Sequence, residues 1–279
     1  MHFLLILAVL LLANILRGKW KNPKGNWIKR WQKALFLFLF PPLLLLMTAI
    51  AIFWMGVGGQ MVGFWDGWLS YLIAASFLIT ALLTLIKISQ EANYILKQTR
   101  SYPIKKIAKK NVRIINTPTL IAALVGLWKP ELVISTGLLE TLPKTHIEAV
   151  IAHEQAHYEY RDSFTFFFLG WVRNFTNFLP NTQLLWEELL ILRELRADAK
   201  AAQKIDKLIL AEALLLTSQT MQKQPEIASI IGIITTGNRL HERIESLLAE
   251  TLPMTQEHKT LWLTLIPASL PLLIVPFHQ

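Results

Sequence analysis

The chain has 279 residues, of which 53% are hydrophobic, with a mean hydropathy of +0.40 and a formal net charge of +9 at pH 7. This apolar content is high for a soluble single-domain enzyme, and several long apolar runs indicate a membrane protein. The absence of cysteine excludes disulfides and thiolate metal ligands. Because the basic residues cluster beside apolar runs, we expect contact with anionic lipid headgroups and no binding of nucleic acid.

Four apolar segments are candidate membrane spans. Residues 34–57 and 68–88 are each long enough as helices to cross about 30 Å of hydrocarbon. Residues 2–16 are shorter, and residues 260–277 contain three prolines. In the first segment the basic residues follow the apolar run, which favours a retained anchor over a cleaved signal peptide. We therefore expect a membrane region with three spans at residues 1–88, a separate domain at residues 89–259 and a fourth span at residues 260–279.

The positions of the basic residues predict the orientation of these spans. Basic side chains separate the first two segments and also follow the third, whereas the turn between the second and third carries only Asp66. Lys and Arg accumulate on the cytoplasmic side of membranes, so the N-terminus should lie outside and residues 89–259 in the cytoplasm. The residues concerned are Arg17, Lys19, Lys21, Lys24, Lys29, Arg30 and Lys33, then Lys97, Arg100, Lys105, Lys106, Lys109 and Lys110.

The pattern changes to short strands between residues 112 and 135. Apolar runs at residues 112–115, 120–125 and 132–135 are separated by Pro118 and by residues 126–130, which predicts a small antiparallel sheet. An edge of this sheet would either add an extended peptide as another strand or pack only against a neighbouring helix.

A helix is predicted from Lys144 to Tyr160, where Thr145 and Glu148 have the spacing of a capping box and no Gly or Pro intervenes. It carries the sequence His153-Glu154-Gln155-Ala156-His157. Positions i and i+4 share a helix face, so both imidazoles can reach one metal ion while Glu154 lies beside it as a general base. The alternative is an ordinary pair of surface histidines.

A catalytic zinc ion usually has three protein ligands and one water, so a third ligand is required. Glu194 is the leading candidate, since it begins a helical Glu-x-x-x-Asp pattern with alanines around it. Asp198, one turn further, would accept a hydrogen bond from a ligating histidine. Glu187 is the main rival for the third ligand and Glu188 a weaker one, and a solvated helix face remains an alternative for Glu194 and Asp198.

Two further helices are predicted in this region. Residues 164–180 are rich in Phe but contain Arg173, which fits an interfacial helix or an ordinary buried one. Residues 238–248 form the second helix, where Arg243 or His241 would stabilise an oxyanion, or else belong to a solvated charged face.

These motifs resemble those of the integral-membrane gluzincin metallopeptidases. The residues that carry the resemblance are His153 to His157 with the following Tyr158-Glu159-Tyr160-Arg161-Asp162, and Glu194-Leu195-Arg196-Ala197-Asp198. The chain is most similar to the BlaR/MecR type (M56-like) and next to the HtpX and CAAX-prenyl endopeptidase type (M48-like). The resemblance covers most of residues 100–250 and extends to the layout of four spans.

The resemblance implies a mainly α, multi-span membrane protein with a zincin-like α+β metallopeptidase domain. One Zn²⁺ per chain would be held by His153, His157 and Glu194, with Glu154 as general base and Asp198 in support. Arg243-Ile244 resembles the Arg-Ile of the HtpX-type C-terminal motif, although Gly237 stands near the place of its His. The chain ends at Gln279, so we expect no penicillin sensor domain.

The expected function is therefore that of a membrane-bound zinc endopeptidase at the cytoplasmic face of a bacterial plasma membrane. Its expected partners are the lipid bilayer and a protein or peptide substrate, such as a cytoplasmic repressor in signalling. The alternatives are a quality-control protease of HtpX type and a catalytically silent zinc-binding membrane scaffold.

Overall fold

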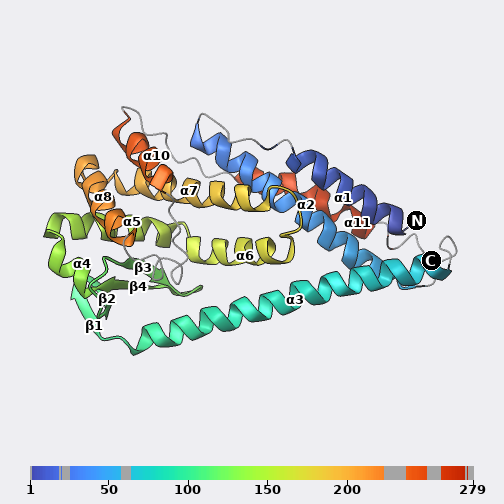
Figure 1. Ribbon diagram of the computed structural model, residues 1–279, viewed down its shortest axis with the longest axis horizontal. Coiled ribbons are helices and arrows are strands. Elements are labelled where there is room, and N and C mark those ends of the chain that lie inside the picture. Colours follow the sequence, from blue (N-terminus) through green and yellow to red (C-terminus); the bar gives the residue numbers. More distant parts are fainter. Residues whose placement is uncertain are drawn as a thin grey trace. The chain divides into compact units, whose positions relative to one another are not determined.

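The computed structural model describes residues 2–18, 20, 26–57, 64–222, 237–249, 259–273 and 275. The chain forms two compact units: unit 1 comprises residues 1–88, 168–190 and 256–279, and unit 2 comprises residues 89–167 and 191–255. Residues 168–190, expected in the separate domain, thus belong to unit 1. The helices (Figure 1) are α1 His2–Gly18, α2 Trp27–Met55, α3 Phe64–Ser101, α4 Thr136–Thr141, α5 Lys144–Glu159, α6 Asp162–Phe175, α7 Thr182–Ala201, α8 Lys207–Gln222, α10 Gly237–Leu248, the 3-10 helix η1 Lys259–Ser269 and α11 Leu270–Leu273.

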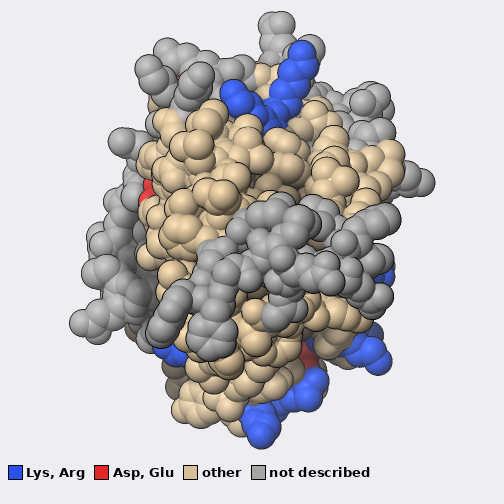
Figure 2. Space-filling model, turned by 90° about the vertical axis from the view of Figure 1, so that its right-hand side faces the viewer, with Lys and Arg blue, Asp and Glu red and all other residues tan. Residues whose placement is uncertain are grey.

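Unit 1 contains the long apolar helix α2 and the part of α3 up to residue 88. Within the described residues, Trp27–Met55 and Gly67–Ser101 are long and apolar enough to cross a membrane, and Phe3–Gly18 and Leu263–Leu273 are shorter apolar helices. In the most apolar window of each long helix, 67% of α2 is buried against the protein but only 17% of α3. The described surface in Figure 2 is largely uncharged, with Lys and Arg towards its upper and lower ends. Most of the apolar window of α3 is thus not buried within the structure.

A buried arginine completes the hydrogen bonding of α2 at its proline pair. Pro41 and Pro42 lack an N–H, which leaves the carbonyls of Leu37 and Phe38 without their helical donors. Arg17, which is fully buried, donates from Nε to the Leu37 carbonyl (2.8 Å) and from Nη2 to the Phe38 carbonyl (2.7 Å). Its guanidinium therefore supplies both missing donors and keeps α2 continuous through the prolines.

Two residues of the expected basic loop make contacts within unit 1, and the orientation of the loop stays a prediction. Arg17 is buried in unit 1, and Arg30 forms a partly buried ion pair with Glu188 at 2.7 Å. These two basic side chains therefore form hydrogen bonds and an ion pair within unit 1. Lys19, Lys21 and Lys24 lie outside the described residues.

Unit 2 contains a four-stranded sheet in the order β1-β2-β4-β3. Its strands are β1 Ile104–Ile107, β2 Lys110–Ile115, β3 Ala122–Val125 and β4 Glu131–Ser135. The prediction of an antiparallel sheet is wrong for one pairing, because β2 and β4 run parallel. After β2 the chain forms β3 at the far edge of the sheet. It then turns at residues that include Gly126 (φ +118°), and β4 pairs between β2 and β3. The sheet is therefore mixed.

Helix α5 packs against β3 and α8 in the core of unit 2. Its predicted apolar stripe is confirmed, since Ile147, Val150 and Ile151 are all buried. The capping box is wrong: Pro143 occupies the N-cap position without a side-chain hydrogen bond, and Thr145 already lies inside the first turn. Because the stripe faces the core, the next turn of α5, with His153 and Glu154, lies at the edge of that core.

Candidate metal centre

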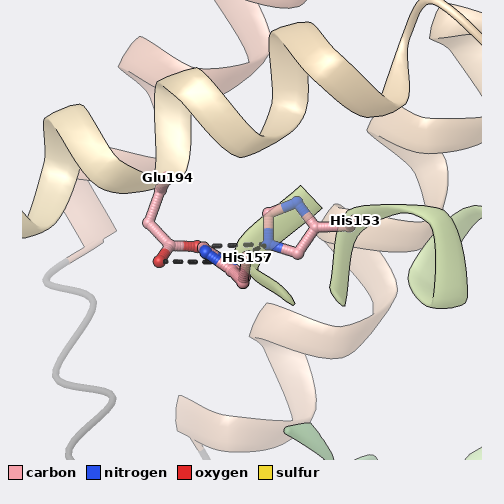
Figure 3. Close-up of side chains that lie close together, drawn as sticks. All are labelled: His153, His157 and Glu194. Atoms are coloured by element: carbon pink, nitrogen blue, oxygen red, sulfur yellow. Dashed lines mark hydrogen bonds and ion pairs between the residues drawn. The ribbon is translucent and has the colours of Figure 1, made fainter. Parts of the chain in front are cut away.

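Three side chains from two helices converge in unit 2 (Figure 3). His153 and His157 come from α5 and Glu194 from α7. The Nε2 atoms of the histidines are 3.1 Å apart, and the Glu194 carboxylate lies 3.3 Å from His153 Nε2 and 3.6 Å from His157 Nε2. The imidazole rings stand edge to face at an interplanar angle of 88°. These donors can all face one point in space.

The separations match the ligand sphere of a small divalent ion. Ligand atoms about 2.0–2.2 Å from a zinc ion in tetrahedral geometry lie about 3.3–3.6 Å apart. The three donor distances of 3.1, 3.3 and 3.6 Å fall close to this range. The group can therefore hold a metal ion with little rearrangement of its side chains.

Each histidine is oriented by a carboxylate on its other ring nitrogen. Asp198 Oδ1 lies 2.8 Å from Nδ1 of His153, and Asp162 Oδ2 lies 2.7 Å from Nδ1 of His157. A carboxylate at Nδ1 favours the proton on that nitrogen and leaves the Nε2 lone pair available. Both imidazoles thus present Nε2 to Glu194.

Arginines hold all three carboxylates of the centre. Arg243 donates from Nε and Nη2 to the two oxygens of Asp198 (2.7 and 2.8 Å), and its Nη1 lies 3.3 Å from Glu194. Arg196 donates to Asp162, and Arg193 donates to Glu194 at 2.9 Å. Carboxylates fixed in this way by charge-assisted hydrogen bonds keep the histidines and Glu194 in place.

The surroundings set the protonation of these groups. Burial raises the pKa of Glu154 above its usual value, which makes this carboxylate a stronger base. For Glu194, burial is opposed by Arg193 and by His157, which together hold the pKa well below its usual range. For His153, burial is outweighed by Asp198, which raises the pKa to about 10. A metal ion bound here would therefore displace a proton from His153.

The structure brings together most of the site residues predicted from the sequence. His153, His157, Glu194, Asp198 and Arg243 meet as described above, and Glu154 projects from the same turn of α5 into two adjoining cavities.

The remaining candidates have other surroundings. His241 is exposed and pairs with Glu245 at 3.0 Å, so it is not part of the centre. Glu187 is exposed and accepts a hydrogen bond from Gln183, and Glu188 is paired with Arg30. Arg243 has nitrogens close to both Asp198 and Glu194, and its role as an oxyanion stabiliser stays a prediction.

Sequence reasoning gave no role to Asp162, Arg196 or Arg193. Asp162 follows the helix of His157 by a short turn in which Arg161 adopts a positive φ of 54°, which ends α5 and begins α6. Its position five residues after His157 can be read from the sequence, but the contact depends on the conformation of the turn between α5 and α6, which the sequence pattern does not specify. Arg193 and Arg196 lie beside Glu194 in the sequence, but their positions do not indicate which carboxylate each of them binds.

The comparisons with known proteins identify the family. The family model for the BlaR1 peptidase M56 matches residues 34–247, which is most of the chain. The chain belongs to this M56 peptidase family. Neither a curated protein nor a solved structure gave a significant match.

An M56 peptidase is a membrane-associated metallopeptidase, and both properties have a counterpart in this structure. The long apolar helix α3 and most of α2 lie within the matched range. The group of His153, His157 and Glu194 is able to hold a metal ion. The matched range also contains both carboxylates that orient the histidines and the arginines that bind them.

Proposed function

We propose that this M56 peptidase is a membrane-embedded zinc endopeptidase that hydrolyses a protein substrate at the cytoplasmic face of a bacterial plasma membrane. The observation that carries the proposal is the convergence of His153, His157 and Glu194, whose donors are spaced for a single ion. Glu154, on the same helix turn, supplies the base that hydrolysis needs.

The donor set favours zinc. Two neutral imidazoles and one carboxylate are a ligand set of hydrolytic zinc sites, which leave a fourth position for water or substrate. A zinc ion held there would polarise the scissile carbonyl and lower the pKa of a bound water towards about 7. The ionised state of Glu194 and the orientation of both histidines by aspartates fit this use.

Each residue of the site then has a distinct part. Glu154 takes the proton from the attacking water and passes it to the leaving amine. Asp198 and Asp162 orient His153 and His157. Arg243 holds Asp198 and Glu194, and we assign it this positioning part in place of the oxyanion role.

Sequence patterns support the proposed location, and the proposed substrate class is chosen to fit that location. We infer four spans and a cytoplasmic catalytic domain from the apolar segments and from the basic residues that flank them. A cytoplasmic regulator, such as a repressor, is the substrate class that fits this side of the membrane. The largely exposed apolar surface of α3 supports a place in the bilayer.

The test compares the purified wild type with Glu154→Gln and Glu159→Gln in detergent. Glu159 lies on the same helix but pairs with Lys204 and Lys200, so it is the matched control. We expect Glu154→Gln to keep its zinc and to lose cleavage of casein and of a model membrane substrate, and Glu159→Gln to keep both. Cleavage retained by Glu154→Gln rules out the mechanism, and zinc binding without cleavage in the wild type indicates a silent scaffold.

A further inference from the structure

The loop that joins β3 to β4 runs back along the C-terminal part of α3. Glu131, the first residue of β4, pairs with Arg100 of α3 at 2.9 Å. Gly126, on the other side of the loop, lies one turn earlier on α3, since a Cβ added there would be 3.4 Å from Leu96 Cδ1. The direction from Arg100 to Leu96 leads towards the apolar run of α3, so Trp128, at the tip of the loop, extends furthest in that direction.

The length of α3 gives the level of this tip relative to a membrane. Gly67–Ile86 contains no charged residue and, at 1.5 Å per residue, matches the hydrocarbon core of about 30 Å. Leu96 lies about 15 Å further along the helix, and two extended loop residues lead back by about 6–7 Å. Trp128 would then lie about 8 Å beyond the hydrocarbon, where the headgroup layer extends over about 5–8 Å.

The Trp128 side chain is held in place but left uncovered. Its indole lies against the ring of Phe164 at the start of α6, with the ring centroids 4.9 Å apart and an interplanar angle of 54°. The residue is nevertheless 82% exposed. An indole has an apolar body and a polar N–H, so an environment that is partly apolar and partly wet suits it better than bulk water.

The neighbouring side chains have the composition of a membrane interface. Tyr94 lies on α3 two residues before Leu96 and is exposed, as are Lys97 on α3 and Lys129 beside Trp128. Trp and Tyr accumulate at the level of lipid headgroups, and Lys side chains there are attracted to anionic lipids. The tip of the loop and the adjoining turn of α3 thus share one chemistry, which continues from the apolar run of α3.

We propose that the loop between β3 and β4 inserts Trp128 into the phospholipid headgroup layer beside α3, with Lys129 next to the lipid phosphates. Unit 2 then has a second attachment to the membrane besides the helix that enters it. The proposal rests on the membrane location in the proposed function and adds a lipid-binding element to it.

This attachment would also bear on the metal centre. The loop follows β3, which packs against α5, the helix that carries His153 and His157. A tip held by lipid therefore keeps this strand, and the helix packed on it, at a constant distance from the membrane surface.

The test measures the depth of the tip with nitroxide labels. The chain has no cysteine, so each of Lys129→Cys, Glu140→Cys and Leu83→Cys carries one label. Lys129→Cys leaves Trp128 in place. Glu140 is exposed on α4, which follows the other end of β4, and Leu83 is exposed in the apolar run of α3. The full chain is reconstituted in vesicles of phosphatidylethanolamine and phosphatidylglycerol. Power saturation then compares collisions with oxygen, which concentrates in hydrocarbon, and with a nickel chelate, which stays in water.

We expect the ratio of oxygen to nickel collisions to be highest for Leu83→Cys, intermediate for Lys129→Cys and lowest for Glu140→Cys. Adding Trp128→Ala to Lys129→Cys should lower its ratio towards that of Glu140→Cys. A ratio for Lys129→Cys equal to that of Glu140→Cys, with Leu83→Cys in lipid, overturns the insertion and leaves the span intact.

Two other results would also overturn the proposal. If the Leu83→Cys label is as open to the nickel chelate as the Glu140→Cys label, the proposed membrane location fails and the insertion fails with it. If the Lys129→Cys label is shielded from nickel only after casein is added, the tip contacts substrate and not lipid.

Discussion

Asp162 Oδ2 lies 2.7 Å from Nδ1 of His157, so a residue outside the metal-binding motif fixes the orientation of its second histidine. Asp162 is itself buried and bound by Arg196, whose guanidinium lies over the Tyr160 ring at 4.1 Å. The relationship repeats that of His153 with Asp198 and Arg243. Each of the two histidines of the centre is thus held by an aspartate and, through it, by an arginine.

Asp162→Asn should weaken zinc binding by about 10–100-fold, because an amide no longer favours the tautomer that presents Nε2 of His157. Competition with a chromogenic chelator measures the affinity. Glu159→Gln, which removes a carboxylate three residues away that binds lysines, should leave the affinity unchanged. Equal affinities in Asp162→Asn and wild type would show that Asp162 has no part in orienting the ligand.

Arg243→Gln should lower the free energy of unfolding by about 3–5 kcal/mol, because the buried carboxylate of Asp198 loses its arginine partner and keeps only His153. Thermal unfolding in detergent tests this. His241→Gln, on the exposed face of the same helix, should change stability little. The double variant Arg243→Gln/Asp198→Asn should be less destabilised than the sum of the single variants. Additive effects would show that the two side chains do not interact.

The residues that converge at the candidate metal centre were largely predictable from the sequence, and so was Asp198, whereas the other supporting residues were not. His153, Glu154 and His157 follow from helical spacing alone, and Glu194 with Asp198 from a second helix with the same periodicity. The carboxylate partner of His157 and the choice of arginine for each aspartate depend on how α5, α6, α7 and α10 pack. Sequence periodicity does not specify that packing.

In the fold, too, local features are predictable from the sequence, whereas contacts between distant residues are not. Three of the four strands and the helices at residues 182–201 and 237–248 follow from local patterns. The parallel pairing of β2 with β4 does not, because β3 lies between them in sequence and at the edge in space. Likewise, the spacing of Arg17 and Pro41 in sequence gives no sign that the guanidinium caps the carbonyls freed by the prolines.

Arg17→Leu should destabilise unit 1, because two buried carbonyls lose their donors at a cost of about 1–3 kcal/mol each. Thermal unfolding in detergent gives the loss. In a Pro41→Ala/Pro42→Ala background, the restored N–H groups of α2 can bond these carbonyls, so Arg17→Leu should cost less there. An equal loss in both backgrounds would show that the arginine does not compensate for the prolines.

Stability should also depend on pH through Glu131. Burial raises the pKa of Glu131, but hydrogen bonds from Arg113 (2.7 Å) and Arg100 (2.9 Å) outweigh it and hold the pKa below its usual value. The stabilisation is therefore present above the pKa of the unfolded chain and is lost as the pH falls through the folded one. Compared with Glu131→Gln, wild type should be more stable by up to about 1 kcal/mol at neutral pH. The difference in stability between wild type and Glu131→Gln should vanish in acid. A difference that grows in acid would contradict a stabilising role of these ion pairs.

Zinc K-edge X-ray absorption of the purified protein, combined with metal analysis, tests the central claim most directly. The wild type should hold one zinc per chain, with two imidazole nitrogens and a carboxylate oxygen at about 2.0–2.2 Å, and Glu194→Gln should lose most of the metal. Full zinc occupancy in Glu194→Gln, or a wild-type spectrum without imidazole ligands, would contradict a centre built from His153, His157 and Glu194.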